Sequence, residues 1–348
     1  MSVIVFFLIY NKGAFSLINR KDSKLFTSLF AALIILFLGL RPISYVFVDM
    51  TTYNHLYHQL QVGDYPASFM ESDVLFASFM LLCSQHMSAQ SFFLIVEVLY
   101  ILPVYWACRR WVDGNADIMM LFFYAAFSFY TYGVNGIRNG MALSCVILAL
   151  SYLKPSMKFK NWLVFLLLST IAILSHKSSL LPIVCALASI FIKNPKFFFQ
   201  FWLLAILLSL VSGNFWGEFF GSLGFDDRLS YLTNEADDQM FSKVGFRWDF
   251  LIYSCMPILL GWYLIYKRKV VSSTYNLLLG TYILANAFWI LVIRAEYSNR
   301  FAYLSWFLYP IVLSFPLLKI PIWKTTQGKK LSVIMLAHLG FTLLMWFM

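Results

Sequence analysis

The stretch 132–143 combines an anion-binding side chain with residues that interrupt a helix. Arg138 stands among three glycines and two asparagines, between the apolar runs 117–134 and 141–153. Glycine and asparagine give a chain backbone freedom and hydrogen-bonding groups where one helix ends and the next begins. An arginine at a membrane boundary must reach water, a partner or a ligand, so Arg138 is either a surface anchor or a ligand-binding residue.

Two residues elsewhere could accept a proton from a substrate. Asp49 precedes a predicted helix at 51–60, and it is either a general base or a solvated or helix-capping aspartate. His176 lies in a polar interruption between two apolar runs, and it is either a general base or phosphate donor or a residue that caps the turn. The spacing leaves the choice between Asp49 and His176 open.

The arginines suggest the chemistry of the ligand. Arg41, Arg138, Arg294 and Arg300 all lie at ends of predicted spans, at the depth of a lipid headgroup. The planar guanidinium binds phosphate with two parallel hydrogen bonds, whereas lysine acts as a point charge. We therefore expect Arg138, Arg294 and Arg300 to bind a pyrophosphate. Weaker candidates for substrate binding are Arg41, Tyr53, Asn135 and Lys177.

The sequence lacks the motifs of metal-binding and nucleotide-binding sites. The histidines, cysteines and acids do not have the spacing of a zinc or calcium site. Phosphate-binding loops and dinucleotide-binding fingerprints are also missing. We expect neither a metal nor a nucleotide cofactor, and the net charge of +10 does not indicate nucleic-acid binding in a chain this apolar.

Composition shows which elements position these residues. The 348 residues are 61% hydrophobic and only 12% charged, whereas soluble domains are roughly 25% charged. The sequence therefore predicts an all-α polytopic membrane protein that forms one integral membrane domain, 1–348. We expect about 12 transmembrane helices, with 74–83 re-entrant or lying at the interface. Their predicted ranges are 3–18, 25–40, 91–108, 117–134, 138–153, 161–175, 178–192, 197–212, 249–266, 275–293, 301–318 and 331–348.

The charges predict the orientation of these helices. One set of alternate loops has 17 basic residues and three acids, and the opposite set has eight basic residues and 13 acids. Cytoplasmic loops are enriched in lysine and arginine. Both termini and the long connections 41–90 and 213–247 are thus predicted to be extracytoplasmic. The candidate arginines, Asp49 and His176 would all lie on that face.

Several short motifs, in order along the chain, resemble the EpsG-like family of bacterial polysaccharide polymerases, which is related to Wzy-type O-antigen polymerases. The segment Gly136–Ala142 is similar to the family's "(N)GxRxGxA" motif. Asp49 with Tyr53, the His176-Lys177-Ser178 junction and the 300–303 segment also match. The 71–73 segment departs from the family, which usually has a glutamate followed by apolar and glycine positions.

The resemblance implies a metal- and nucleotide-independent glycosyltransferase with a fold similar to the GT-C enzymes. Such an enzyme joins oligosaccharide repeat units carried on undecaprenyl pyrophosphate, at the periplasmic face of the bacterial inner membrane. Its donor and acceptor are both lipid-linked oligosaccharides, membrane lipid surrounds it, and a chain-length-regulator protein is a possible partner. Nucleic acid is not expected to bind.

Two other functions remain as alternatives. A flippase or transporter of lipid-linked oligosaccharide would also need arginines and aromatic residues, but along a lateral cavity through many spans. In this sequence the charges gather on one face, and Glu97 is the main exception within a span. A membrane O-acyltransferase would usually have a histidine deep in a span, within reach of a cytosolic acyl donor, whereas His176 is predicted on the opposite side.

Overall fold

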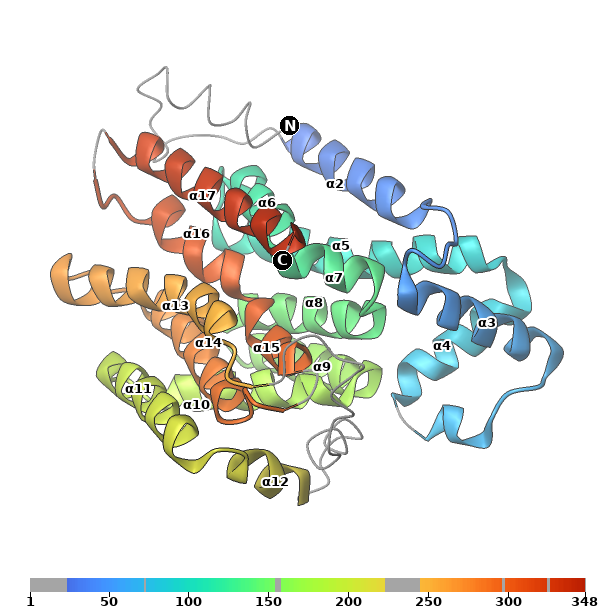
Figure 1. The fold of residues 1–348 in the computed structure, drawn as a ribbon. Helices are drawn as coiled ribbons and strands as arrows, with labels where there is room; N and C mark the ends of the chain where they lie inside the picture. The colour runs from blue at the N-terminus through green and yellow to red at the C-terminus, as the bar shows by residue number, and fades with distance from the viewer. Residues whose placement is uncertain are drawn as a thin grey trace. The chain divides into compact units, whose positions relative to one another are not determined.

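The computed structural model describes residues 24–71, 73–153, 158–222, 245–295, 298–323 and 326–347, and all regular structure among them is helical (Figure 1). The elements are α2 (Lys24–Gly39), α3 (Val48–Val62), η1 (Ala67–Met70), α4 (Val74–His86), α5 (Ala89–Trp111), α6 (Ala116–Tyr124), α7 (Phe127–Val134), α8 (Ile137–Tyr152), α9 (Phe159–Ser175), η2 (Lys177–Ser179), α10 (Leu180–Phe191), α11 (Pro195–Ser212), α12 (Phe215–Ser222), α13 (Trp248–Trp262), η4 (Tyr263–Lys267), α14 (Ser273–Leu291), α15 (Ser298–Trp306), α16 (Tyr309–Lys319) and α17 (Gln327–Phe347).

The helices are those of a membrane-embedded protein. Among the residues that the structure describes, six helices are long and apolar enough to cross a membrane, and the bent pair α6 and α7 makes a seventh if it is one span. Leu33 on α2, Leu167 on α9 and Leu207 on α11 are each at least 60% exposed. Apolar surface of this kind is unfavourable in water but suits lipid tails. The total of 12 spans stays a prediction, and the first of them, 3–18, lies outside the described residues.

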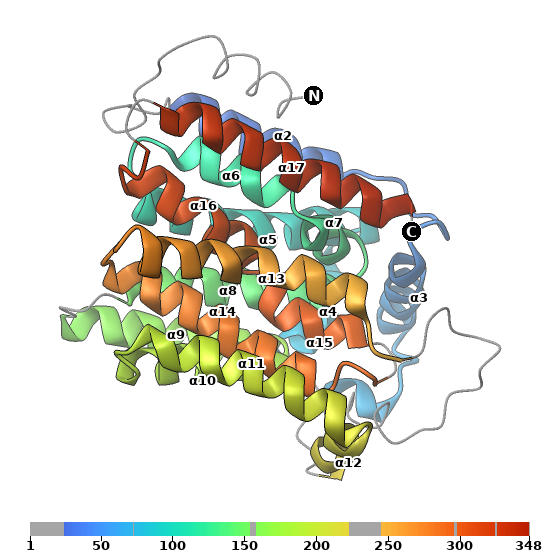
Figure 2. The same ribbon diagram turned by 60° about the vertical axis from the view of Figure 1, so that its left-hand side comes forward.

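The predicted span at 117–134 is broken into two helices, α6 and α7. The chain bends by 74° between α6 and α7. Thr342 on α17 donates a hydrogen bond to the carbonyl of Ala125 at the break, over 2.7 Å, and the ring of His338 lies 3.1 Å from the carbonyl of Phe122. Figure 2 shows α17 alongside α6. A broken helix is tolerated in a membrane where neighbouring side chains satisfy the carbonyls that the break leaves open.

The chain divides into two compact units. The first comprises Met1–Leu180 and Ser314–Met348, and the second comprises Leu181–Leu313. In the first unit α5 packs against α2 and α8, and α8 packs against α9. The buried Phe92 on α5 packs against the rings of Tyr57 on α3 and Phe76 on α4. The prediction of a single membrane domain is not decided by this division.

In the second unit α14 packs against α11, α13 and α15 (Figures 1 and 2). Asn286 on α14 is fully buried; it accepts a hydrogen bond from the indole of Trp202 on α11 and donates one to Ser305 on α15. A buried polar group is stable only when it is hydrogen-bonded, so these pairings fix three helices together.

Candidate functional site

The candidate site lies in the first unit, where α7 ends and α8 begins. Two amides, those of Asn135 and Gly136, donate to the carbonyl of Thr131 over 3.1 and 2.8 Å and close the turn. Arg138 follows in the first turn of α8, as expected from the sequence. The side chain therefore starts from a hydrogen-bonded turn between two helices.

The glycines of this stretch allow close packing. A Cβ on Gly140 would lie 2.9 Å from the carbonyl oxygen of Tyr132, closer than real Cβ atoms come. Gly136 has a φ of −79°, which any residue can adopt, and its nearest neighbour would be 3.7 Å away. The structural reason for glycine is thus the close approach of α7 to α8 at Gly140 rather than the backbone freedom inferred from the sequence.

Asp73 is the centre of a polar cluster that joins four segments. Its Oδ2 lies 3.0 Å from Nη1 of Arg138 and 2.9 Å from Nδ1 of His176. Its Oδ1 accepts a hydrogen bond from the backbone N–H of Lys177 over 3.0 Å. The Nε of Arg138 also donates to the hydroxyl of Tyr53 over 3.0 Å. We call these five residues the Asp73 cluster.

The position of Asp73 is unusual for an aspartate that precedes a helix. It stands directly before α4, where an aspartate normally accepts a hydrogen bond from the helix it caps, but its side chain makes no such bond. Its backbone is left-handed, with a φ of 51°, which non-glycine residues rarely adopt. Such strain is found where the surrounding structure requires a particular side-chain position. Here the carboxylate is directed to α8 and to the 176–177 junction.

The charge state of Asp73 follows from its partners. Burial by itself raises the pKa of this carboxyl. The hydrogen bond from His176, the charge of Arg138 and the backbone N–H of Lys177 act in the opposite direction and prevail, so the pKa of Asp73 lies below its usual range. Asp73 is therefore an anion at neutral pH. A carboxylate with three donors already in place is a poor proton acceptor, and it is better suited to orienting its partners.

His176 ends α9 and begins the turn η2, as expected for a junction between two helices. Its side chain is 5% exposed, and Nδ1 is directed at Asp73. A carboxylate that binds one nitrogen of an imidazole fixes the ring orientation and favours protonation at the other nitrogen. Lys177 contributes its backbone N–H to the cluster, while its side chain is exposed.

Asp49 and Tyr53 lie on one face of α3, because residues four apart in a helix are neighbours. Helix α3 begins at Val48 and is preceded by Phe47, so Asp49 does not cap a helix that starts at 51. Asp49 is half-buried and close enough to Arg138 to interact with it electrostatically. The structure thus brings together five sequence-predicted residues, namely Asp49, Tyr53, Arg138, His176 and Lys177.

The guanidinium of Arg138 is only partly used by the protein. Nε and Nη1 have partners, whereas Nη2 has no hydrogen-bond partner among the residues that the structure describes. The side chain is 38% exposed, compared with 7% for Asp73. Nη2 can therefore bind an anionic group while Nε and Nη1 are held in place by Tyr53 and Asp73.

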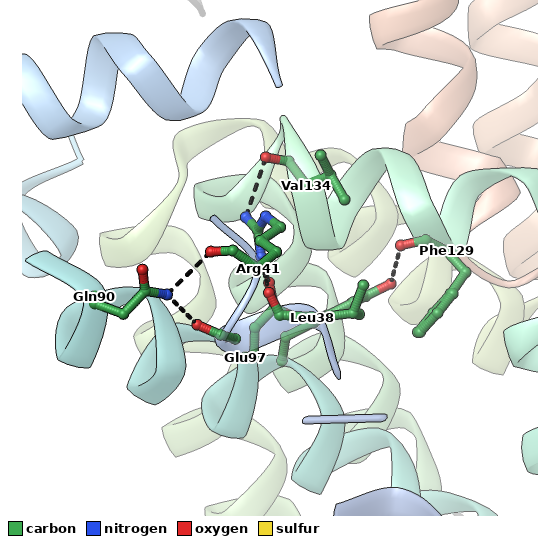
Figure 3. Close-up of polar contacts among 8 residues, drawn as sticks. Leu38, Arg41, Gln90, Glu97, Phe129 and Val134 are labelled. Carbon is green, nitrogen blue, oxygen red and sulfur yellow. Dashed lines mark hydrogen bonds and ion pairs between the residues drawn. The ribbon is translucent and has the colours of Figure 1, made fainter. Parts of the chain in front are cut away.

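Arg41 lies in a different environment (Figure 3). It is 7% exposed, and its Nη1 makes an ion pair with Oε1 of Glu97 over 3.0 Å. Nη1 also donates to the carbonyl of Leu38, and Nη2 donates to the carbonyl of Val134 over 3.4 Å. An arginine with these partners is placed to hold helices together, so direct binding of substrate by Arg41 is not supported by its contacts.

The remaining predicted residues lie in the turn before α8 and in the second unit. Asn135 is half-buried in the turn itself. Arg294 and Arg300 belong to the second unit, where Arg294 lies 5.5 Å from the ring centroid of Phe246 and Arg300 is in the first turn of α15. Most of the connection 213–247 lies outside the described residues.

Asp73 is the site residue that sequence reasoning missed. It was one of several acids in a long connection, without a motif of its own, and a pairing over 65 positions to Arg138 leaves no local signal. The available indication was the 71–73 segment, where the sequence departs from the family pattern. Glu71 in this segment is exposed, so the buried acid is Asp73.

A comparison with known protein families identifies the family of this chain. A family model described as the EpsG family matches residues 24–348. No curated protein and no solved structure matches the chain.

Proposed function

Because the chain belongs to the EpsG family, we propose that it is a polysaccharide polymerase that joins oligosaccharide repeat units carried on undecaprenyl pyrophosphate. The observation that supports this proposal most is the Asp73 cluster. It holds a half-exposed arginine next to an oriented histidine, and a transfer from a lipid pyrophosphate needs both a cation for the leaving group and a proton acceptor.

In the proposed reaction a hydroxyl of the acceptor sugar attacks the anomeric carbon of the donor. A new C–O glycosidic bond forms, and the bond from that carbon to the pyrophosphate oxygen breaks. The hydroxyl proton passes to the protein base, and undecaprenyl pyrophosphate leaves with the bonding electrons. The Nη2 group of Arg138 would stabilise the charge that develops on this leaving group.

His176 is the better supported of the two proton acceptors. Its Nδ1 is bound to Asp73, which stabilises the imidazolium that forms when the other nitrogen takes a proton. Asp49 remains the alternative, because it lies near Arg138 on the accessible side of α3. Asp73 would position both His176 and Arg138 without taking a proton itself.

The cluster needs additional positive charge to hold a pyrophosphate. Asp73 and Asp49 together offset the single charge of Arg138. Within the first unit, the exposed amine of Lys177 is the candidate for the missing charge. The predicted binding of pyrophosphate by Arg138, Arg294 and Arg300 is part of the proposal, as are a GT-C-like arrangement of 12 spans, the periplasmic orientation and a chain-length-regulator partner.

The experiment is a gel of the surface glycan from a strain that lacks the protein. We expect single repeat units attached to their acceptor, because units still reach the outer face and only their joining fails. The wild-type chain should restore the ladder of lengths. The variants Arg138→Ala and His176→Ala should fail to restore it while remaining in the membrane at normal amounts.

The same gel separates the alternatives. Loss of a flippase would leave no unit displayed, since lipid-linked units would stay inside. Loss of an acyltransferase would leave a full ladder without one ester. A normal ladder in the deletion strain would refute the polymerase proposal.

A further inference from the structure

The short helix α7 is held at both ends by side chains that belong to α5 and to the end of α2. At its start, the hydroxyl of Tyr100 on α5 donates to the carbonyl of Phe129 over 3.1 Å. At its end, the guanidinium of Arg41 donates to the carbonyl of Val134 (Figure 3). Glu97, one turn before Tyr100 on α5, binds the same guanidinium. We call Arg41, Glu97 and Tyr100 the α7 clamp.

Arg41 serves two helix ends at once. The last carbonyls of any helix lack partners within the helix, and that end has a partial negative charge. Arg41 donates to Leu38 at the end of α2 and to Val134 at the end of α7. Gln90 supports the arrangement by donating to the carbonyls of Gly39 and Arg41 over 2.7 and 3.1 Å. The buried guanidinium supplies a donor to the carbonyl of Val134 and a second donor to the carbonyl of Leu38, which also accepts from the backbone N–H of Arg41.

Glu97 makes the buried cation possible. It is 1% exposed, and an unpaired arginine at this depth would be costly. The absence of a side chain at Gly133 gives room for this contact. A Cβ there would come within 3.2 to 3.4 Å of Leu38, of Glu97 Oε2 and of Tyr100. The clamp and the glycine of α7 therefore fit each other.

Since Arg138 follows Val134 by four residues, the end of α7 determines where α8 and its arginine begin. We infer that Arg41 and Glu97 are positioning residues, which hold the α7–α8 turn so that Arg138 is presented to an anionic ligand. The role in ligand binding rests on the proposed function. The role in fixing the turn does not depend on it.

The experiment compares full-length wild-type and variant proteins in lipid nanodiscs with two independent measurements. Arg41→Lys keeps the charge beside Glu97 but lacks the second donor group that reaches Val134. We expect hydrogen exchange of the amides at 135–140 to become about fivefold faster or more, because this turn opens more often. We also expect the Kd for undecaprenyl pyrophosphate to rise about tenfold.

The matched control is Arg110→Lys on the same helix as Glu97. Arg110 donates to Ser151 and lies over the ring of Tyr152, at the far end of α8 from Arg138. In the Arg110→Lys variant, hydrogen exchange at 135–140 and the Kd for undecaprenyl pyrophosphate should both stay within about twofold of wild type. If Arg41→Lys fails to fold, the double variant Arg41→Met with Glu97→Leu removes both charges together, and this usually preserves stability. In this double variant the amides at 135–140 should still exchange faster than in the wild type, because the carbonyl of Val134 loses its hydrogen-bond donor.

A double-mutant cycle tests whether the clamp acts through Arg138. In an Arg138→Ala background, Arg41→Lys should change the Kd by less than about twofold. The inference would be overturned if Arg41→Lys changed the Kd equally in both backgrounds. It would also be overturned by unchanged hydrogen exchange at 135–140 in a folded Arg41 variant. Faster exchange at 135–140 in Arg41→Lys, together with no binding of the lipid by the wild type, would instead refute the proposed function and leave the positioning role standing.

Discussion

Replacing Asp73 by asparagine should disable the protein while leaving its shape nearly unchanged. The carboxylate accepts two hydrogen bonds on Oδ2 and one on Oδ1. A carboxamide offers only one oxygen. If that oxygen takes the Oδ2 position, the amide nitrogen faces the N–H of Lys177; in the other orientation it faces the donors of Arg138 and His176. At least one hydrogen bond is lost either way, and Arg138 loses its counter-charge.

The magnitude follows from the burial of the pair. Breaking a buried ion pair costs about 3–5 kcal/mol, but Arg138 is 38% exposed, so solvent reduces the loss to about 2 kcal/mol. Since 1.4 kcal/mol corresponds to a factor of ten, we expect kcat/KM for polymerisation to fall about 30-fold or more. The assay is the extension of lipid-linked repeat units by purified full-length protein.

Two control variants separate the carboxylate from its backbone position. Asp73→Gly removes the side chain but accepts the φ of 51° without strain, so it should fold and also lose activity. Glu71→Gln changes an exposed acid in the same connection and should keep wild-type activity. An Asp73→Asn protein with kcat/KM within about threefold of wild type would refute the argument.

The pH dependence of stability gives an independent check on Asp73. Its pKa is lower in the folded protein than the ordinary value of about 3.9. The stability that this carboxylate contributes is therefore fully present above pH ~4 and is lost as the pH falls through the folded pKa. The stability advantage of the wild type over Asp73→Asn should shrink in that acidic range and be constant near neutral pH.

Three further predictions concern the turn, the arginine and the topology. Arg138→Lys keeps the charge but cannot bind Asp73, Tyr53 and an anion together, so polymer formation on the surface-glycan gel should fall sharply at normal expression; an unchanged length distribution would make Arg138 a mere anchor. Gly140→Ala should reduce both folded protein and activity, because its Cβ would lie 2.9 Å from a backbone oxygen, whereas Gly136→Ala should be tolerated; equal behaviour of the two variants would contradict the packing argument. A cysteine introduced at Asp64, in a chain without native cysteines, should react with a membrane-impermeant maleimide in intact spheroplasts, and labelling only after lysis would reverse the predicted orientation.

The class of the protein could be predicted from the sequence alone. A chain with 61% hydrophobic and 12% charged residues has few stable arrangements other than helices in a membrane. Each predicted span from 25 onwards coincides with a helix or a helix pair, because apolar length and helical period are local properties. The motifs at 49–53, 136–142 and 176–178 were also visible as short-range patterns, and the family that they resemble is the one whose model matches residues 24–348.

Only the tertiary structure decided which of these residues meet. Asp73 pairs with His176 across 103 positions, and an acid in a long polar connection has no local feature that predicts this pairing. The same is true of Arg41, which the sequence placed with the other span-end arginines and which the fold pairs with Glu97. The bend at Ala125 could not be predicted from the sequence, because a single apolar run is compatible with both a straight span and a broken one. Local sequence sets helix formation, whereas ion pairs and helix breaks depend on neighbours that are brought close only by packing.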